Sequence, residues 1–191
     1  MFRRAFVRLA LVGTALAVLL PGIVVGQGPT TTVYLVRHAE KGTTPAGDPP
    51  LTEAGMARAR ALAALLADSG VTAVITTDLV RTKDTGQPLA MARKIVPLVV
   101  SVRGTGTAAH VTAVADAVRS QGGGAVLVVG HSNTIPMIIE ALGGGPQLPI
   151  CDAAYANLFT MRLNSGGAPK LTSGKYGAAD PDGSNTCVPK P

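Results

Sequence analysis

The chain has 191 residues, of which 47% are hydrophobic and 3% are aromatic, and its formal net charge is +6. This length suits a single domain, whose core must be built from Val, Leu, Ile and Ala. So few aromatic side chains argue against a stacking platform for single-stranded nucleic acid.

The N-terminal segment has the pattern of an export signal. Three arginines within residues 3–8 precede an apolar stretch over 9–20, and small or β-branched residues follow as far as Gly26. We expect a signal peptide over 1–26 that is cleaved before Gln27, and therefore a periplasmic or extracellular protein without stable membrane association. A retained signal anchor is the alternative, because the uncharged stretch approaches the ~20 residues that span a bilayer. Cleavage removes three arginines and no acid, so the net charge falls from +6 to +3, too little to indicate a nucleic-acid partner.

The remaining residues, 27–191, are expected to form one domain in which apolar strands alternate with helices. The predicted elements are a buried strand over 33–36, a helix after Thr52, a strand over 71–77, a helix over 79–93, a strand within 94–102, a helix marked by Val111, Val114 and Val118, a buried strand over 125–129, a short helix over 135–142 and a hairpin turning at 165–168. This order predicts a three-layer α/β/α sandwich with a mostly parallel central sheet.

The helix after Thr52 has the clearest local signals. Thr52 is a typical N-cap, and Glu53 in the first turn favours the helix dipole. One apolar face is formed by Ala59, Leu62, Ala63 and Leu66, whereas Arg58, Arg60 and Asp68 lie away from it.

Two cysteines, Cys151 and Cys187, lie in the C-terminal part. In an exported protein an even number of cysteines favours a disulfide, and two buried free thiols are the alternative. A bond would close a loop of about 35 residues and hold the Gly- and Pro-rich tail against the domain.

Charged side chains follow several strands directly. Arg37 and His38 end the first strand, and His131 ends the strand over 125–129. Arg81 lies at the start of the helix over 79–93, whose free N–H groups favour an anion, and its planar fork suits phosphate oxygens. In a parallel sheet ligands bind beyond the carboxyl ends of the strands, so these residues form a candidate site. Structural histidines and a solvated arginine are the alternative reading.

Four segments together resemble the histidine phosphatase superfamily, which includes the phosphoglycerate mutases. The segment LVRHAEK resembles the Arg-His-Gly signature, with Ala39 in the glycine position, and PLTEAGMARARAL resembles a second motif, with Arg58 where glutamine is common. TTDLVRTKDT and VLVVGHSNTI are similar to the segments that carry the second arginine and the second histidine, here Arg81 and His131. The resemblance covers about residues 33–145, while the hairpin and tail over 146–191 match nothing diagnostic.

The resemblance implies a phosphoglycerate mutase-like fold and a phosphatase that works without a metal or other cofactor on a small phosphorylated substrate. His38 would form a phosphohistidine, while Arg37, Arg81 and His131 would bind the phosphoryl group. A non-catalytic protein that binds phosphate or phosphoesters with the same pocket is the alternative, and a true mutase is less expected.

One departure from the family pattern concerns the general acid. Many members carry a glutamate after the second arginine. Between residues 82 and 130, however, the only acidic residues of this chain are Asp84 and Asp116. Glu40 and His110 are candidate proton donors. Alternatively, Glu40 pairs with Arg37 and His110 lies on the surface of a helix.

Overall fold

The computed structural model describes residues 29–104, 106–184 and 187, so the expected signal peptide over 1–26 lies outside them. None of the helices in these ranges has the length and apolar character that a membrane crossing requires.

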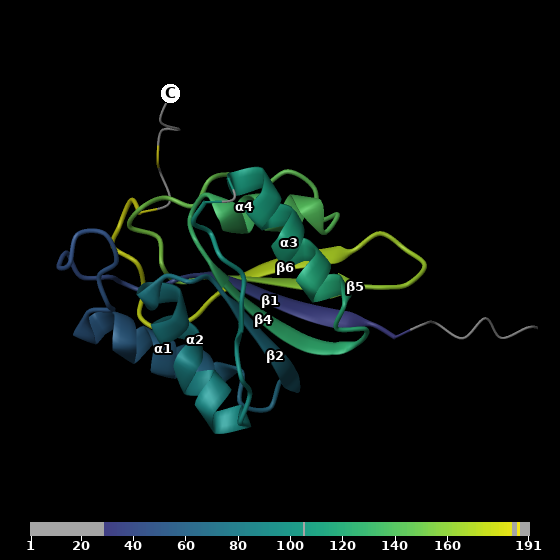
Figure 1. The fold of residues 1–191 in the computed structure, drawn as a ribbon, viewed down its shortest axis with the longest axis horizontal. Helices are drawn as coiled ribbons and strands as arrows, with labels where there is room; N and C mark the ends of the chain where they lie inside the picture. The colour runs from purple at the N-terminus through teal and green to yellow at the C-terminus, as the bar shows by residue number, and fades with distance from the viewer. Residues whose placement is uncertain (1–28, 105, 185–186, 188–191) are drawn as a thin grey trace, which may run out of the picture.

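The described chain forms a six-stranded sheet between two layers of helices (Figure 1). The elements are β1 (Thr31–Arg37), α1 (Glu53–Leu65), β2 (Val71–Thr76), α2 (Val80–Arg93), β3 (Leu98–Val99), α3 (Thr107–Arg119), β4 (Gly124–Gly130), α4 (Thr134–Ala141), β5 (Asn157–Leu163) and β6 (Lys170–Lys175). The strand order is β3-β2-β4-β1-β5-β6. The first four strands of this order are parallel, whereas β5 pairs antiparallel with β1 and β6 pairs antiparallel with β5. The predicted three-layer architecture and the predicted hairpin are confirmed.

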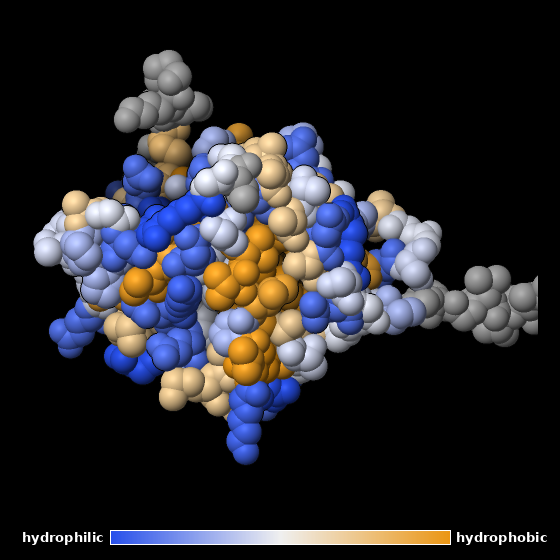
Figure 2. Space-filling view, viewed as in Figure 1, coloured by the Kyte–Doolittle hydropathy of each residue, from blue (hydrophilic) through white to orange (hydrophobic). Residues whose placement is uncertain are grey.

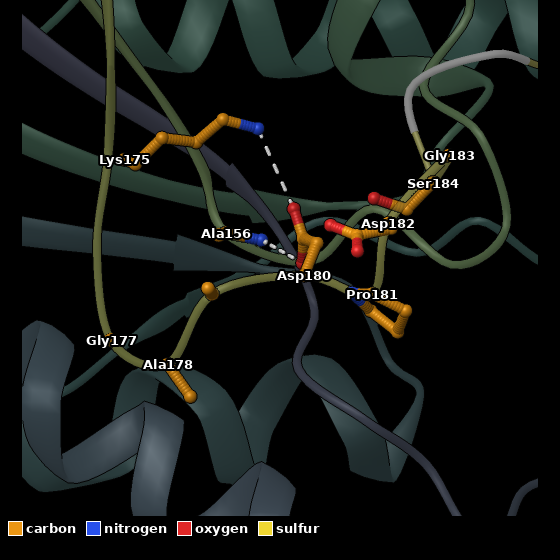
Figure 3. A pocket seen from close by; sticks show the side chains of 10 residues that line it. Ala156, Lys175, Gly177, Ala178, Asp180, Pro181, Asp182, Gly183 and Ser184 are labelled. Atoms are coloured by element: carbon orange, nitrogen blue, oxygen red, sulfur yellow. Dashed lines mark hydrogen bonds and ion pairs between the residues drawn. The ribbon is translucent and has the colours of Figure 1, made fainter.

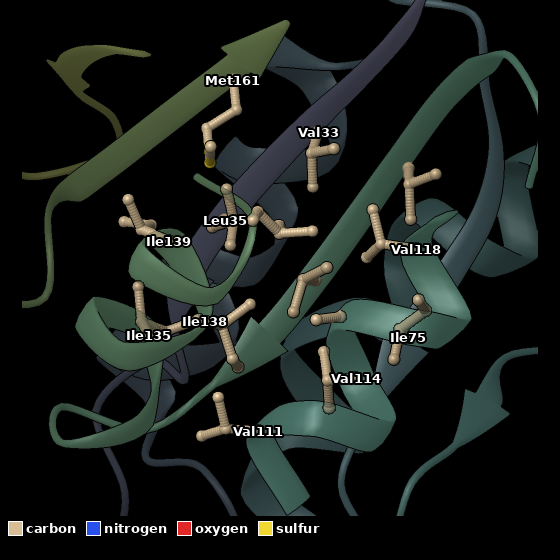
Figure 4. Packing of buried hydrophobic residues seen from close by; sticks show 14 of the residues in the cluster. Val33, Leu35, Ile75, Val111, Val114, Val118, Ile135, Ile138, Ile139 and Met161 are labelled. Atoms are coloured by element: carbon tan, nitrogen blue, oxygen red, sulfur yellow. The ribbon is translucent and has the colours of Figure 1, made fainter. Parts of the chain in front are cut away.

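The two faces of the sheet bury separate apolar clusters because successive side chains of a strand point to opposite faces. Val33 and Leu35 of β1 pack with helices α3 and α4, whereas Val36 packs with α1 and α2. Figure 4 shows the first cluster, in which valines of α3 and isoleucines of α4 meet the strands. Aliphatic side chains therefore supply the core, as the composition predicts.

Helix α1 begins close to the turn that follows β1. The Thr52 side chain accepts a hydrogen bond from the Gly55 N–H at 3.1 Å, which confirms the predicted N-cap. A Cβ atom at position 55 would overlap the carbonyl oxygen of Glu40. Glycine at this position thus lets the helix pack directly against the backbone two residues after His38.

Arg58 differs from the expectation that it lies away from the buried face, since it is only 4% exposed. Its guanidinium binds the Glu40 carboxylate and donates to the carbonyl oxygens of Tyr176 (3.0 Å) and Ala178 (2.9 Å). These partners compensate the charge for the loss of water, so burial is possible away from the apolar stripe.

The strand expected within residues 94–102 is short and lies at the edge of the sheet, with Pro97 directly before it. Val96, Leu98 and Val99 of this segment are exposed. Figure 2 shows apolar side chains gathered in the middle of the face on which this segment runs.

Cys151 and Cys187 form a disulfide, as predicted, and the alternative of two free thiols is wrong. The bond joins residues 36 positions apart. In the chain-entropy model, closing a loop of this size stabilises the folded state by roughly 3–4 kcal/mol. It also fixes Cys187 beside the loop that follows α4.

Candidate functional site

The parallel pairing of β1 with β4 brings the two strand-end histidines together. The register places Arg37 opposite Gly130, and the His38 N–H donates to the Gly130 carbonyl at 2.9 Å. As a result, the ring centroids of His38 and His131 lie 5.4 Å apart. The expected meeting of the strand ends at one sheet edge is therefore observed.

The His38 ring has one fixed and one available nitrogen. Its Nδ1 lies 2.8 Å from the carbonyl oxygen of Ala39, which can only accept, so Nδ1 carries the hydrogen. The lone pair of the neutral ring is then on Nε2. The turn itself is held to α2, because the Ala39 N–H donates to the Thr85 hydroxyl at 3.0 Å, which in turn donates to the Arg81 carbonyl.

Both histidines are held neutral by their surroundings. Burial lowers the pKa of His38 to about 3, with further lowering by the nearby charges of Arg37, His131 and Arg81, while the hydrogen bond to Ala39 acts in the opposite direction. Burial and the positive charge of Arg81 likewise lower the pKa of His131 to about 4. An uncharged imidazole with a free lone pair is a nucleophile, so the site can support attack by His38 near neutral pH.

Arg37 is fixed by the loop that follows α4. Its Nη1 donates to the carbonyl oxygens of Cys151 (2.8 Å) and Asp152 (2.7 Å), and its Cζ lies 4.3 Å from the centre of the Tyr155 ring. The Nε–H is buried and has no partner among the described residues. A buried donor without a partner is costly, so this group indicates a place for an acceptor.

Arg81 shows the same feature. It is the second residue of α2, and its Nε is also buried without a partner in the described ranges. Its Nη1 lies 3.7 Å from Asp48, whose Oδ1 accepts a hydrogen bond from the Val80 N–H at 2.9 Å. Asp48 thus already occupies part of the helix N-terminus that the sequence suggested as an open anion site, and the side chain of Arg81 is the remaining donor.

His131 completes the group at the sheet edge. Its Nε2 lies 3.3 Å from the Thr77 hydroxyl at the end of β2, and its backbone N–H donates to the Thr134 hydroxyl at 3.1 Å. The threonine at the start of α4 therefore caps the strand-to-helix turn that presents the histidine. Together with the arginines, these contacts give a cationic group of hydrogen-bonding side chains suited to a tetrahedral oxyanion.

Neither candidate proton donor has the position that the alternative interpretation gave it, namely Glu40 paired with Arg37 and His110 on the surface. Glu40 pairs with Arg58 rather than with Arg37, and both of its oxygens bind that guanidinium at 2.7–3.0 Å. His110 is buried instead of lying on the surface, with Nδ1 3.0 Å from the Ser101 carbonyl and Nε2 unpartnered among the described residues.

Three contributors to the site were missed by sequence reasoning. Asp48 lies in a Gly- and Pro-containing turn, where an aspartate is expected for local reasons alone. Tyr155 and Asp152 belong to a short loop between the disulfide and β5 that carries no recognisable motif. A rare aromatic residue in such a loop was the only available signal.

Within residues 29–104, 106–184 and 187, no three His, Cys, Asp or Glu side chains gather as metal ligands. The positive charge of the candidate site is supplied by the guanidinium groups of Arg37 and Arg81.

The lowered pKa values predict a stability loss in acid. In the unfolded chain both histidines bind a proton near their ordinary pKa of 6.5, whereas the folded protein resists protonation down to about pH 4 at His131 and about pH 3 at His38. Below pH 6.5 the unfolded state therefore binds more protons, and each histidine lowers the unfolding free energy by up to about 1.4 kcal/mol per pH unit.

Urea unfolding at pH 7, 6 and 5 measures this loss. His38→Asn and His131→Asn should each weaken the pH dependence relative to the unmodified protein. An unchanged slope in both variants would show that the two rings are protonated equally in the folded and unfolded states.

The sequence and fold were compared with known proteins. The family model described as histidine phosphatase superfamily (branch 1) matches residues 33–103. None of the curated proteins that were compared matches the chain. The structure of the protein histidine phosphatase SixA complexed with tungstate is similar with a TM-score of 0.60 and 18% identity, covering 75% of this chain and 96% of that one.

Two further structures share the fold. SixA from Nakamurella multipartitia has a TM-score of 0.57 and 24% identity, covering 80% of this chain and 99% of that chain. A phosphoglycerate mutase from Bacillus anthracis has a TM-score of 0.58 and 18% identity, covering 76% of this chain and 93% of that chain. The predicted phosphoglycerate mutase-like fold is thus confirmed, and the match of the family model over residues 33–103 agrees with the resemblance of the motifs at the sheet edge to the histidine phosphatase superfamily.

Proposed function

We propose that the protein is an exported phosphohydrolase that acts on a small phosphorylated substrate through a phosphohistidine at His38. The observation that carries this proposal is the pair of buried Nε–H donors of Arg37 and Arg81, which have no partner in the described part of the chain and lie beside a neutral His38 ring. Donors of this kind match phosphate oxygens, and the structure of the protein histidine phosphatase SixA, which shares the fold, is of a complex with the oxyanion tungstate.

The first step is an in-line displacement at phosphorus. Nε2 of His38 forms the N–P bond as the bond to the leaving-group oxygen breaks, and the departing oxygen takes a proton from water or from an acidic group. Positive charge develops on the ring, and the Nδ1–H bond to the Ala39 carbonyl stabilises it. Arg37, Arg81 and His131 donate to the equatorial oxygens.

The second step is hydrolysis. Water attacks phosphorus on the side opposite the ring, the P–N bond breaks, and its electron pair returns to Nε2. Inorganic phosphate leaves with the added oxygen, and His38 is neutral again. Both steps use donors and lone pairs of the protein, so we propose that the reaction needs no metal ion.

Export is part of the same proposal. The N-terminal sequence pattern supports it, and a disulfide is typical of oxidising compartments. A second candidate function is a phosphate-binding protein without turnover. The ion pair that occupies Glu40 favours this alternative, because it removes one candidate proton donor.

Trapping of the intermediate tests the proposal. Incubation with a ³²P-labelled aryl phosphate followed by rapid quenching should leave label on the protein that resists base and is lost in acid, as a phosphoramidate is. Label that survives acid but not base would indicate an acyl phosphate instead. Binding of phosphate without any labelling or hydrolysis would favour the non-catalytic alternative.

A further inference from the structure

The chain segment after β6 returns to the edge of the sheet that holds Arg37. Asp180 lies in this segment, and its side chain is 4% exposed. Its Oδ1 accepts hydrogen bonds from the backbone N–H groups of Tyr155 (2.8 Å) and Ala156 (2.9 Å). Figure 3 shows the Asp180 carboxylate between Ala156 and Lys175. One carboxylate oxygen therefore fixes the backbone at which the loop enters β5.

The loop over 151–156 surrounds the Arg37 guanidinium. The carbonyl oxygens of Cys151 and Asp152 bind Nη1, and the Tyr155 ring covers the carbon of the guanidinium at 4.3 Å. Two crosslinks to the tail hold this loop, the disulfide at residue 151 and the Asp180 hydrogen bonds at residues 155 and 156.

We propose that Asp180 is a positioning residue for phosphate binding, which holds Tyr155 over Arg37 and thereby orients the Nε–H of that arginine, a donor that no described residue accepts from. This inference rests on the proposed role of Arg37 as a phosphate ligand. An arginine held by two carbonyls and an aromatic face loses little further freedom when an oxyanion binds, so affinity depends on these supports.

The charge of Asp180 also serves the surrounding structure. Lys175 Nζ lies 3.5 Å from Oδ2, and Arg58 Nη2 lies 3.9 Å from Oδ1. Because Arg58 also binds Glu40, Asp180 is linked through Arg58 to the turn after His38 as well as to the Tyr155 loop. A test must therefore separate the effect through Tyr155 from a general loss of ion pairs.

The first experiment measures binding of inorganic phosphate to the purified protein by calorimetry. Asp180→Ala should raise the Kd about tenfold, the scale of one well-formed cation–π contact. Asp180→Asn keeps an Oδ1 acceptor for the two backbone N–H groups and should bind almost as the unmodified protein does. Asp182→Ala is the matched control. Asp180 and Asp182 line one cavity (Figure 3), but Asp182 is exposed and has no hydrogen bond or ion pair within the described ranges.

The second experiment tests the route through Tyr155. Tyr155→Leu should raise the phosphate Kd by a similar factor, whereas Tyr155→Phe keeps the ring and should not. In the Tyr155→Leu background, Asp180→Ala should have little additional effect. If the two substitutions instead raise the phosphate Kd by the product of their separate factors, the proposal is overturned. So would normal phosphate binding by Tyr155→Leu, a result that decides the matter even if Asp180→Ala does not fold.

These measurements are independent of turnover. An unmodified protein that binds phosphate but hydrolyses no phosphoester would contradict the proposed phosphatase function and leave the role of Asp180 intact. Equal phosphate Kd values for Asp180→Ala and Asp182→Ala would contradict the role of Asp180 alone. An unmodified protein that does not bind phosphate would overturn both proposals.

Discussion

Replacing His38 by alanine is expected to reduce the rate of aryl phosphate hydrolysis by at least about 10⁴-fold, because the nucleophile of a covalent mechanism has no substitute. The Nε2 lone pair of this ring is the available one, since Nδ1–H is bound to the Ala39 carbonyl. Phosphate affinity should change far less, because both arginines remain. Steady-state kinetics and phosphate calorimetry on the same preparation measure the two effects separately.

His110→Ala is the matched control for this variant. His110 is also a buried histidine, with 1% exposure against 3% for His38, so a similar imidazole volume is removed. This control should retain aryl phosphate hydrolysis within about tenfold, because departure of an aryl group needs little protonation. A residual rate in His38→Ala equal to that of His110→Ala would show that His38 does not form the intermediate.

The placement of the two strand-end histidines could be predicted from the sequence. Two continuous apolar runs each end directly in a histidine, and continuous apolar strands indicate a parallel sheet covered on both faces. The carboxyl ends of parallel neighbours lie at one edge, so His38 and His131 had to be close if the two strands pair. The register of Arg37 with Gly130 fulfils this condition.

The burial of Arg58 could not be predicted in the same way. Helical periodicity assigns a charged residue off the apolar stripe to solvent, because the partners that could compensate its burial are not local. Here the partners are Glu40 and two carbonyl oxygens of the tail, which lie 118 and 120 positions after Arg58 in the chain. Contacts of this kind depend on loop conformation, which no periodic pattern encodes.

The contact between Asp180 and the Tyr155 loop has the same origin. These residues are separated by the β5–β6 hairpin, and the N–H groups that bind the carboxylate belong to an irregular segment. The hairpin itself was predictable from its alternating strands and its turn residues. The contact of Asp180, which follows the hairpin, with the Tyr155 loop was not predictable.

A strong preference for activated phosphates is the second large effect that we expect. A positioned general acid typically contributes about 10²–10⁴-fold, or roughly 3–5 kcal/mol of barrier, and this contribution matters most for poor leaving groups such as alkoxides. Glu40 is a poor donor because both of its oxygens accept from Arg58. The Nδ1–H of His110 is bound to the Ser101 carbonyl, so this hydrogen already has an acceptor within the protein.

The measurement compares kcat/KM for an aryl phosphate with kcat/KM for a simple alkyl phosphate, and determines the same ratio for a histidine phosphatase that has a glutamate as general acid. The alkyl ester should suffer a penalty larger by about 10²–10⁴-fold here. Near-equal values for the two esters would mean that the pocket does contain a general acid. Glu40→Gln and His110→Ala, made separately, would then show whether either residue supplies the proton.

The structure adds two more groups to that comparison. The Asp152 side chain is fully exposed and lies 3.9 Å from Nη2 of Arg37, and the Tyr155 hydroxyl has no hydrogen bond to another described residue. Both residues belong to the loop that holds Arg37, beside the proposed phosphate site. If alkyl esters are hydrolysed well, Asp152→Asn or Tyr155→Phe should slow them selectively while aryl esters react as before. Equal slowing of both ester classes would assign these side chains to binding, because proton donation matters chiefly for the alkoxide.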